Sequence, residues 1–134
     1  MVEILPLTKI GEDERGSTHI FETDRTGEFI FSFRKAGSLS GRHYHKGVSP
    51  NKNPEKIILV KGEGTLNWHD VNGNKKGSEK IIGPSLIHIY PYAWPELASH
   101  DRLALPDIHQ VAPFFISEYR WNDPEIRAQS QILT

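Results

Sequence analysis

The chain has 134 residues, of which 37% are hydrophobic, so it can build one globular core but not two, and we expect a single domain over residues 1–134. Sixteen basic and seventeen acidic residues leave a net charge of −1, which gives no overall field to attract nucleic acid or an anionic membrane surface. The absence of cysteine excludes disulfides and thiol catalysis, and because there is neither a signal-peptide pattern nor an apolar run near ~20 residues, we expect a cytoplasmic protein.

Strand-like patterns dominate the first half of the chain. Residues 28–34 carry phenylalanine at every second position, which is the spacing of one strand face. Residues 56–60 form a short apolar run rich in β-branched side chains, and residues 65–71 alternate in polarity up to Asn72 and Gly73. The Asn-Gly pair predicts a tight hairpin turn.

The second half continues the same pattern of short strands separated by Gly, Pro and Asn. Further strands are predicted at residues 80–82, 86–90 and 114–119. This spacing favours an all-β sandwich or barrel. The tail at 123–129 predicts a short C-terminal helix, because its Asp-Pro start suits a helix N-terminus. Residues 46–54 and 91–113 are predicted to be irregular.

His43 and His45 are the histidines with an instructive spacing. On an extended strand, residues two apart project from the same face, so both imidazoles would share one enclosed space if that face points into a barrel. Two neighbouring imidazoles suit the ligation of a divalent metal or proton transfer by a base. The alternative is a pair of surface histidines in a polar loop.

The sequence around this pair resembles the first motif of the cupin superfamily. The matching residues are Gly41-Arg42-His43-Tyr44-His45, followed by Glu55, six residues and Gly62. The interval between His45 and Glu55 is longer than in the family motif, and the excess falls in the irregular stretch at 46–54. The resemblance implies an all-β fold, a single cupin-type (jelly-roll) β-barrel, in which Glu55 joins the two histidines.

A narrower resemblance begins near the N-terminus. Asp13-Glu14-Arg15-Gly16-Ser17, followed by Phe21-Glu22, resembles the opening of the dTDP-4-dehydrorhamnose 3,5-epimerases, the dTDP-sugar 3,4-ketoisomerases and the cupin domain of capsular polysaccharide assembling proteins. The resemblance implies that Arg15 contacts the nucleotide phosphates, since a guanidinium can donate two bonds to them. It also implies that His43 is the catalytic base and that His45 matches the second histidine of the ketoisomerases. The alternative for Arg15 is a surface turn.

Two positions depart from these families. Ser40 stands where the families have an arginine, and Pro95 stands where the second cupin motif has a histidine. A cupin metal is typically held by three histidines and a glutamate. A divalent metal on His43, His45 and Glu55 therefore stays possible but would lack its fourth ligand, for which only the neighbouring Glu96 and His88 offer replacements.

Three functions follow from these residues. The favoured one is a cofactor-free epimerase or ketoisomerase that acts on a dTDP-4-keto-6-deoxy sugar through proton abstraction by His43 or His45. The second is a metal-dependent cupin enzyme that uses His43, His45 and Glu55. The third is a non-catalytic module that binds a sugar. Tyr119 is added as a substrate-binding residue without motif support, and the resemblance implies a homodimer that pairs through edge strands.

Overall fold

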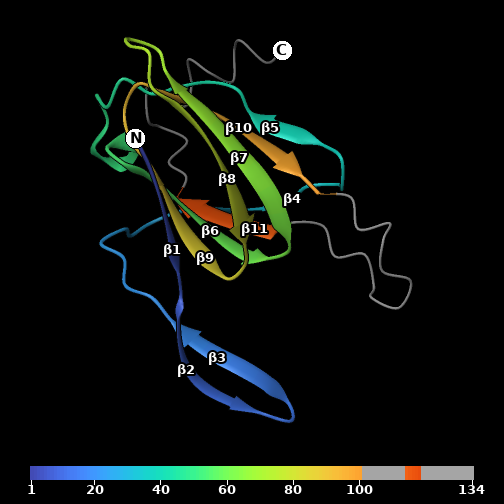
Figure 1. The fold of residues 1–134 in the computed structure, drawn as a ribbon. Coiled ribbons are helices and arrows are strands. Elements are labelled where there is room, and N and C mark those ends of the chain that lie inside the picture. Colours follow the sequence, from blue (N-terminus) through green and yellow to red (C-terminus); the bar gives the residue numbers. More distant parts are fainter. Residues whose placement is uncertain (101–113, 119–134) are drawn as a thin grey trace.

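The computed structural model describes residues 1–100 and the backbone of residues 114–118 (Figure 1). Within these residues the regular structure is almost entirely strand. The strands are β1 (Val2–Pro6), β2 (Thr8–Asp13), β3 (Gly16–Ile20), β4 (Phe29–Phe33), β5 (Leu39–Gly41), β6 (Glu55–Lys61), β7 (Glu63–Asp70), β8 (Lys76–Ile82), β9 (Ser85–Ile89), β10 (Ala93–Ser99) and β11 (Phe114–Glu118). A single turn of 3₁₀ helix, η1 (Pro50–Lys52), precedes β6. The all-β prediction is confirmed for the described residues.

The strands form two larger sheets and one separate hairpin. The five-stranded sheet has the order β1-β9-β6-β11-β4, the four-stranded sheet has the order β5-β10-β7-β8, and the pairings between the described strands are antiparallel. The two larger sheets lie face to face, and the β2–β3 hairpin extends away from them (Figure 1). The described strands therefore build a two-layer antiparallel β-structure.

The core lies between the two sheets. Its buried members come from both layers: Leu59, Leu66, Ile81, Ile87, Ile89 and Ala93. Each belongs to the inward-facing set of its strand, so the alternation of side chains along the strands decides which residues form the core. The apolar runs at 56–60 and 86–90 therefore supply much of the interior, as their sequence predicts.

Two sequence-based expectations are wrong. His43 and His45 do not lie on a strand, because β5 ends at Gly41. Gly41 and Arg42 have φ angles of 84° and 60°, and two successive left-handed residues turn the chain out of the extended conformation. The stretch predicted as irregular from residue 91 contains β10. Pro95 fits into β10 because it lies beyond the end of β5, where its carbonyl accepts from the Arg42 N–H. On that side no strand needs a backbone N–H from position 95.

The remaining predictions divide between confirmed and undescribed residues. The turn at Asn72 and Gly73 is confirmed, and it joins β7 to β8. The predicted C-terminal helix at 123–129 and Tyr119 lie outside the described residues. No helix in the described ranges is long and apolar enough to cross a bilayer.

Candidate active site

The segment that carries the two histidines is held at both ends by β10 and the turn before it. The Arg42 N–H donates to the Pro95 carbonyl at 2.7 Å, and the Tyr92 N–H donates to the His45 carbonyl at 2.8 Å. Gly41 permits the first contact, because a Cβ at this position would lie 2.8 Å from the Pro95 carbonyl oxygen. The backbone around the histidines is thus fixed although it is not part of a sheet.

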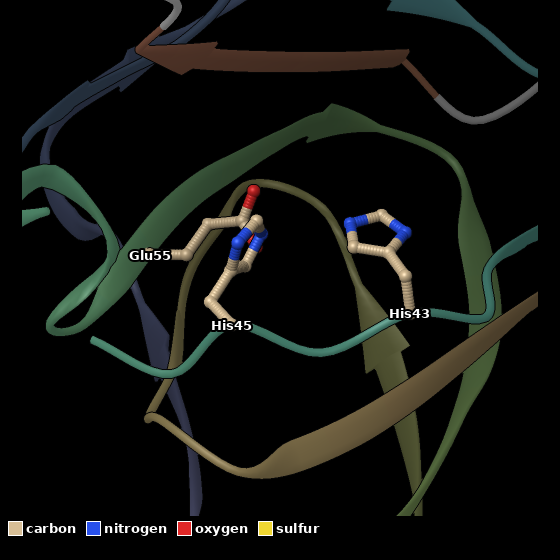
Figure 2. Close-up of side chains that lie close together, drawn as sticks. All are labelled: His43, His45 and Glu55. Atoms are coloured by element: carbon tan, nitrogen blue, oxygen red, sulfur yellow. The ribbon is translucent and has the colours of Figure 1, made fainter. Parts of the chain in front are cut away.

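His43 and His45 bring their rings together. The ring centroids are 5.1 Å apart and the planes are nearly perpendicular, at 85° (Figure 2). His43 Nδ1 lies 2.8 Å from the Gly41 carbonyl oxygen. Because a carbonyl only accepts, Nδ1 must carry the proton, which leaves the lone pair of a neutral ring on Nε2. The predicted proximity of the two imidazoles is present, though it arises from a turn.

Glu55, the first residue of β6, connects the histidines to a buried lysine. Its Oε2 lies 3.4 Å from His45 Nε2, and its Oε1 accepts a hydrogen bond of 2.8 Å from Lys52 Nζ. His45 and Lys52 are both buried, each with 6% of its surface exposed. Lys52 is a residue that the sequence analysis missed. The cluster is therefore a buried carboxylate held between an imidazole and an ammonium group.

The protonation of this cluster follows from burial and charge. Burial lowers the pKa of His43, and the opposing effect of the Glu55 carboxylate is smaller. For Glu55, burial raises the pKa, but the contacts with His45 and with the Lys52 ammonium together hold it well below its usual range. At neutral pH the site thus contains a neutral His43 beside an ionised Glu55.

The loop at 46–54 has a defined conformation that places Lys52 at the site. The Ser49 side chain caps η1 by accepting from the Asn51 N–H. The Arg25 guanidinium donates to the Pro50 carbonyl at 3.1 Å and to the Pro54 carbonyl at 2.7 Å, so it clamps both ends of the turn. The additional residues of the loop therefore have a defined conformation that ends in a residue of the site.

A cavity of about 190 Å³ lies between the two sheets beside His43. Apolar side chains from both layers make up most of its wall: Ile30, Ile57, Leu66, Ile87, Ile89 and Leu97. Its polar groups include Ser32, Ser40, Arg34, His43 and Glu55. Arg34 is the second residue that the sequence analysis missed, and it shares this wall with Ser40, the position of the absent family arginine. The volume is below the ~300 Å³ at the low end of ligand pockets, so it suits one part of a ligand, such as a single sugar ring.

The other residues singled out in the sequence lie elsewhere. Arg15 is at the exposed end of the β2–β3 hairpin, where it pairs with Asp13 at 2.7 Å. Glu96 pairs with Arg42 at 2.9 Å, and His88 Nδ1 lies 3.4 Å from a carboxylate oxygen of Glu3. Neither Glu96 nor His88 lines the cavity, so neither takes the place of the histidine that Pro95 replaces.

The donor set matches a cupin metal site only in part. The ligand atoms of His43, His45 and Glu55 all lie within 4.8 Å of one another. However, Pro95 lines the cavity with a side chain that has no ligand atom, and the Glu55 carboxylate is already bound by Lys52. A metal ion would have to compete with an ammonium group for its only anionic ligand, so these residues do not fit a resident divalent metal.

Comparison with known proteins bears on the fold. No family model and no curated protein matches the sequence. Among solved structures, the chain is similar to a 3,4-ketoisomerase from Helicobacter canadensis (20% identity, 98% of this chain and 94% of that chain covered, TM-score 0.65). It is also similar to the TDP-quinovose 3,4-ketoisomerase WlaRB from Campylobacter jejuni (19% identity, 92% and 88% covered, TM-score 0.63). A third similar structure is the dTDP-4-dehydrorhamnose 3,5-epimerase from Elizabethkingia anophelis (15% identity, 91% and 71% covered, TM-score 0.61).

These similarities define a class by its fold. The chain has the fold of the sugar-nucleotide ketoisomerases and epimerases, as its resemblance to that branch of the cupins predicts. At these identities the likeness extends to the fold alone, and the chemistry has to be argued from the site.

Proposed function

We propose that this chain is a sugar-nucleotide isomerase that acts on a dTDP-4-keto-6-deoxy sugar with His43 as its base. The observation that carries the proposal is a neutral imidazole that lines a mostly apolar cavity with Nδ1 engaged by the backbone. A base of this kind is unprotonated at cellular pH and faces the space that a sugar ring would fill. The fold shared with ketoisomerases and epimerases supports the same chemistry.

The proposed reaction is a proton transfer next to a ketone. His43 Nε2 takes the proton from a carbon adjacent to the C4 carbonyl, and the C–H electron pair moves to form an enolate. Return of a proton to the same carbon from the opposite face gives an epimer. Transfer of the 3-hydroxyl proton to the enolate oxygen on C4, with return of the abstracted proton from His43 to C4, gives the 3-keto isomer. The His45 ring packs edge-on against the His43 ring and contacts Glu55, so we assign His45 to the orientation and charge balance of the base.

Arg34 supplies the donor that the enolate requires. Arg34 lines the same cavity as His43 and is the cationic residue among those that line it, and its Nη1 donates to the Phe33 carbonyl at 3.0 Å. A guanidinium positioned at the developing oxygen charge stabilises the transition state more than the ground state. We therefore propose that Arg34 has the role that the absent arginine at position 40 would have had.

Solvent deuterium exchange tests the proposal. When the wild type is incubated with dTDP-4-keto-6-deoxyglucose in D₂O, deuterium should appear at a carbon next to the ketone. Mass spectrometry of the sugar measures this incorporation. His43→Ala should reduce the exchange rate by about 10²–10⁴-fold. His69→Ala is the matched control, because His69 is exposed and stacks on Trp94 at the other surface of the four-stranded sheet. Exchange at the wild-type rate in His43→Ala would refute the role of His43.

In the proposed reaction, Arg15 can contact the substrate only at the site of a second copy of the chain. It lies on a hairpin that forms a sheet of its own and extends away from the layers that enclose the cavity (Figure 1). Large apolar residues on and after the hairpin, Ile10, Ile20 and Phe21, are 43–61% exposed, which is typical of a surface that packs against a partner. We propose a homodimer in which Arg15 of one copy contacts the phosphates bound at the other.

A non-catalytic sugar-binding module is the second candidate. It is favoured by Pro95, which lines the cavity where the resemblance predicts a histidine. In that case the chain would bind dTDP or a dTDP-sugar, measured by calorimetry, without any deuterium exchange. Binding together with exchange excludes this alternative.

A further inference from the structure

Lys52 is buried in a position where lysine is rarely found. Its side chain is 7% exposed, and its Nζ donates to Glu55 Oε1 at 2.8 Å. A lysine is almost never fully buried unless it is paired, because removing an ammonium group from water is expensive. The second oxygen of the same carboxylate faces His45 Nε2 at 3.4 Å. Both oxygens of Glu55 thus have partners inside the chain.

The placement of Lys52 is enforced by its surroundings. The Arg25 guanidinium donates to the carbonyl of Pro50, the first residue of η1, and to that of Pro54, which follows η1, and the Lys52 N–H donates to the Ser49 carbonyl at 3.0 Å. These contacts hold the backbone of the turn, so Nζ is directed at Glu55 by a fixed loop. Lys52 lies three residues before Glu55, which is the first residue of β6, so the loop itself brings the two side chains together.

We infer that the Lys52 ammonium takes the place of a metal ion in the His43–His45–Glu55 cluster and makes the cluster selective against divalent cations. A cluster of two imidazoles and one carboxylate within 4.8 Å would otherwise offer three ligands to a metal such as zinc. The ammonium neutralises the buried carboxylate, which is the electrostatic task that the ion would perform. It also orients Glu55 toward His45, and so it positions the neighbour of the proposed base.

The selectivity follows from electrostatics. A divalent ion bound to Glu55 would lie within a few ångströms of Nζ, because both would share one carboxylate. Repulsion between a double and a single positive charge at that separation is strong where water is excluded and remains appreciable even where it is not. This inference goes beyond the proposed reaction, since it concerns the cation preference of the free protein and holds for any substrate.

Zinc titration of the purified, chelator-treated protein tests the inference without substrate. Lys52→Met removes the charge and keeps an unbranched apolar stem. We expect Lys52→Met to bind one Zn²⁺ at least about tenfold more tightly than the wild type in isothermal titration calorimetry. Lys75→Met, on the exposed β7–β8 turn, is the matched control and should bind as the wild type does. The double variant Lys52→Met, Glu55→Gln should lose the gain, because it lacks the anionic ligand.

Two results would overturn the inference. One is equal Zn²⁺ affinity in Lys52→Met and the wild type, and the other is a gain that survives in the double variant. Circular dichroism establishes that each variant is folded, and Lys52→Gln repeats the test if Lys52→Met is not. Should neither fold, the wild type decides: stoichiometric Zn²⁺ binding that His43→Ala abolishes overturns the inference, and absence of such binding supports it.

Discussion

Charged residues are placed in opposite ways in two regions of the molecule. One region is the His43–His45–Glu55 cluster with Lys52, and the other is the β2–β3 hairpin. In the cluster, the carboxylate of Glu55 is buried and both of its oxygens are engaged by groups of the same chain. On the hairpin, Arg15 and Asp13 pair in the open, with side chains 84% and 41% exposed. The cluster is therefore a complete local unit shielded from solvent, whereas the hairpin pair lies open to solvent.

The difference predicts very different effects on stability. Glu55→Gln leaves the Lys52 ammonium buried without its counter-charge, so we expect a loss of about 3 kcal/mol in the free energy of unfolding. Asp13→Asn breaks an exposed pair of the same charge type and should leave the urea midpoint unchanged. The double variant Glu55→Gln, Lys52→Met should lose less than the sum of the single variants. Equal midpoints for Glu55→Gln and Asp13→Asn would remove the contrast between the two regions.

We proposed that Arg15 of one copy contributes to the site of the other copy, and complementation between two variants tests this. Mixing a His43→Ala chain with an Arg15→Ala chain, each inactive at low substrate concentration, should restore about a quarter of the wild-type rate, because half of the dimers then hold one intact site. If Arg15 served its own chain, no intact site would form and no activity would return. Light scattering of the purified wild type should report a dimer.

The pH dependence of the unfolding free energy should show a smaller effect from the same cluster. Because burial lowers the pKa of His43, the folded chain binds fewer protons than the unfolded chain between the folded pKa and the unfolded value near 6.5. Stability should therefore fall as the pH drops through this window. Glu55, whose folded pKa is also lowered, adds to the loss only below roughly pH 4.3.

Urea titrations of the wild type and of His43→Gln between pH 7.5 and about 5, compared with each other, measure the contribution of His43. His43→Gln should flatten the dependence of the unfolding free energy on pH across this range. An unchanged slope in His43→Gln would show that the protonation of His43 does not differ between the folded and unfolded states.

The sequence predicts the strands well where alternation is strong, but it does not reveal which face points inward. In β4 the phenylalanines at alternate positions mark the strand, yet Phe29, Phe31 and Phe33 are 47–65% exposed. The opposite face, Ile30 and Ser32 followed by Arg34, lines the cavity. Because a ligand cavity requires polar groups, the more apolar face of a strand is not always the buried one. This inversion is the reason that Arg34 was missed.

The candidate site was predictable where it follows a spaced motif and unpredictable where it depends on a loop. His43, His45 and Glu55 meet as the resemblance implies, although a left-handed turn brings the histidines together. Lys52 lies in a stretch whose composition indicates only irregular structure, and its position depends on contacts with the distant Arg25. Long-range contacts of this kind leave no periodic signal in a sequence. The single domain over 1–134, the cytoplasmic location and the role of Tyr119 stay predictions.

The state of the His43 ring at neutral pH is the most direct test of the account. A long-range ¹H–¹⁵N correlation spectrum distinguishes the two neutral tautomers and the protonated ring. We predict a neutral imidazole with its proton on Nδ1 and an unprotonated Nε2, as the contact with the Gly41 carbonyl requires. A protonated ring, or a neutral ring with its proton on Nε2, would contradict the assignment of His43 as the base.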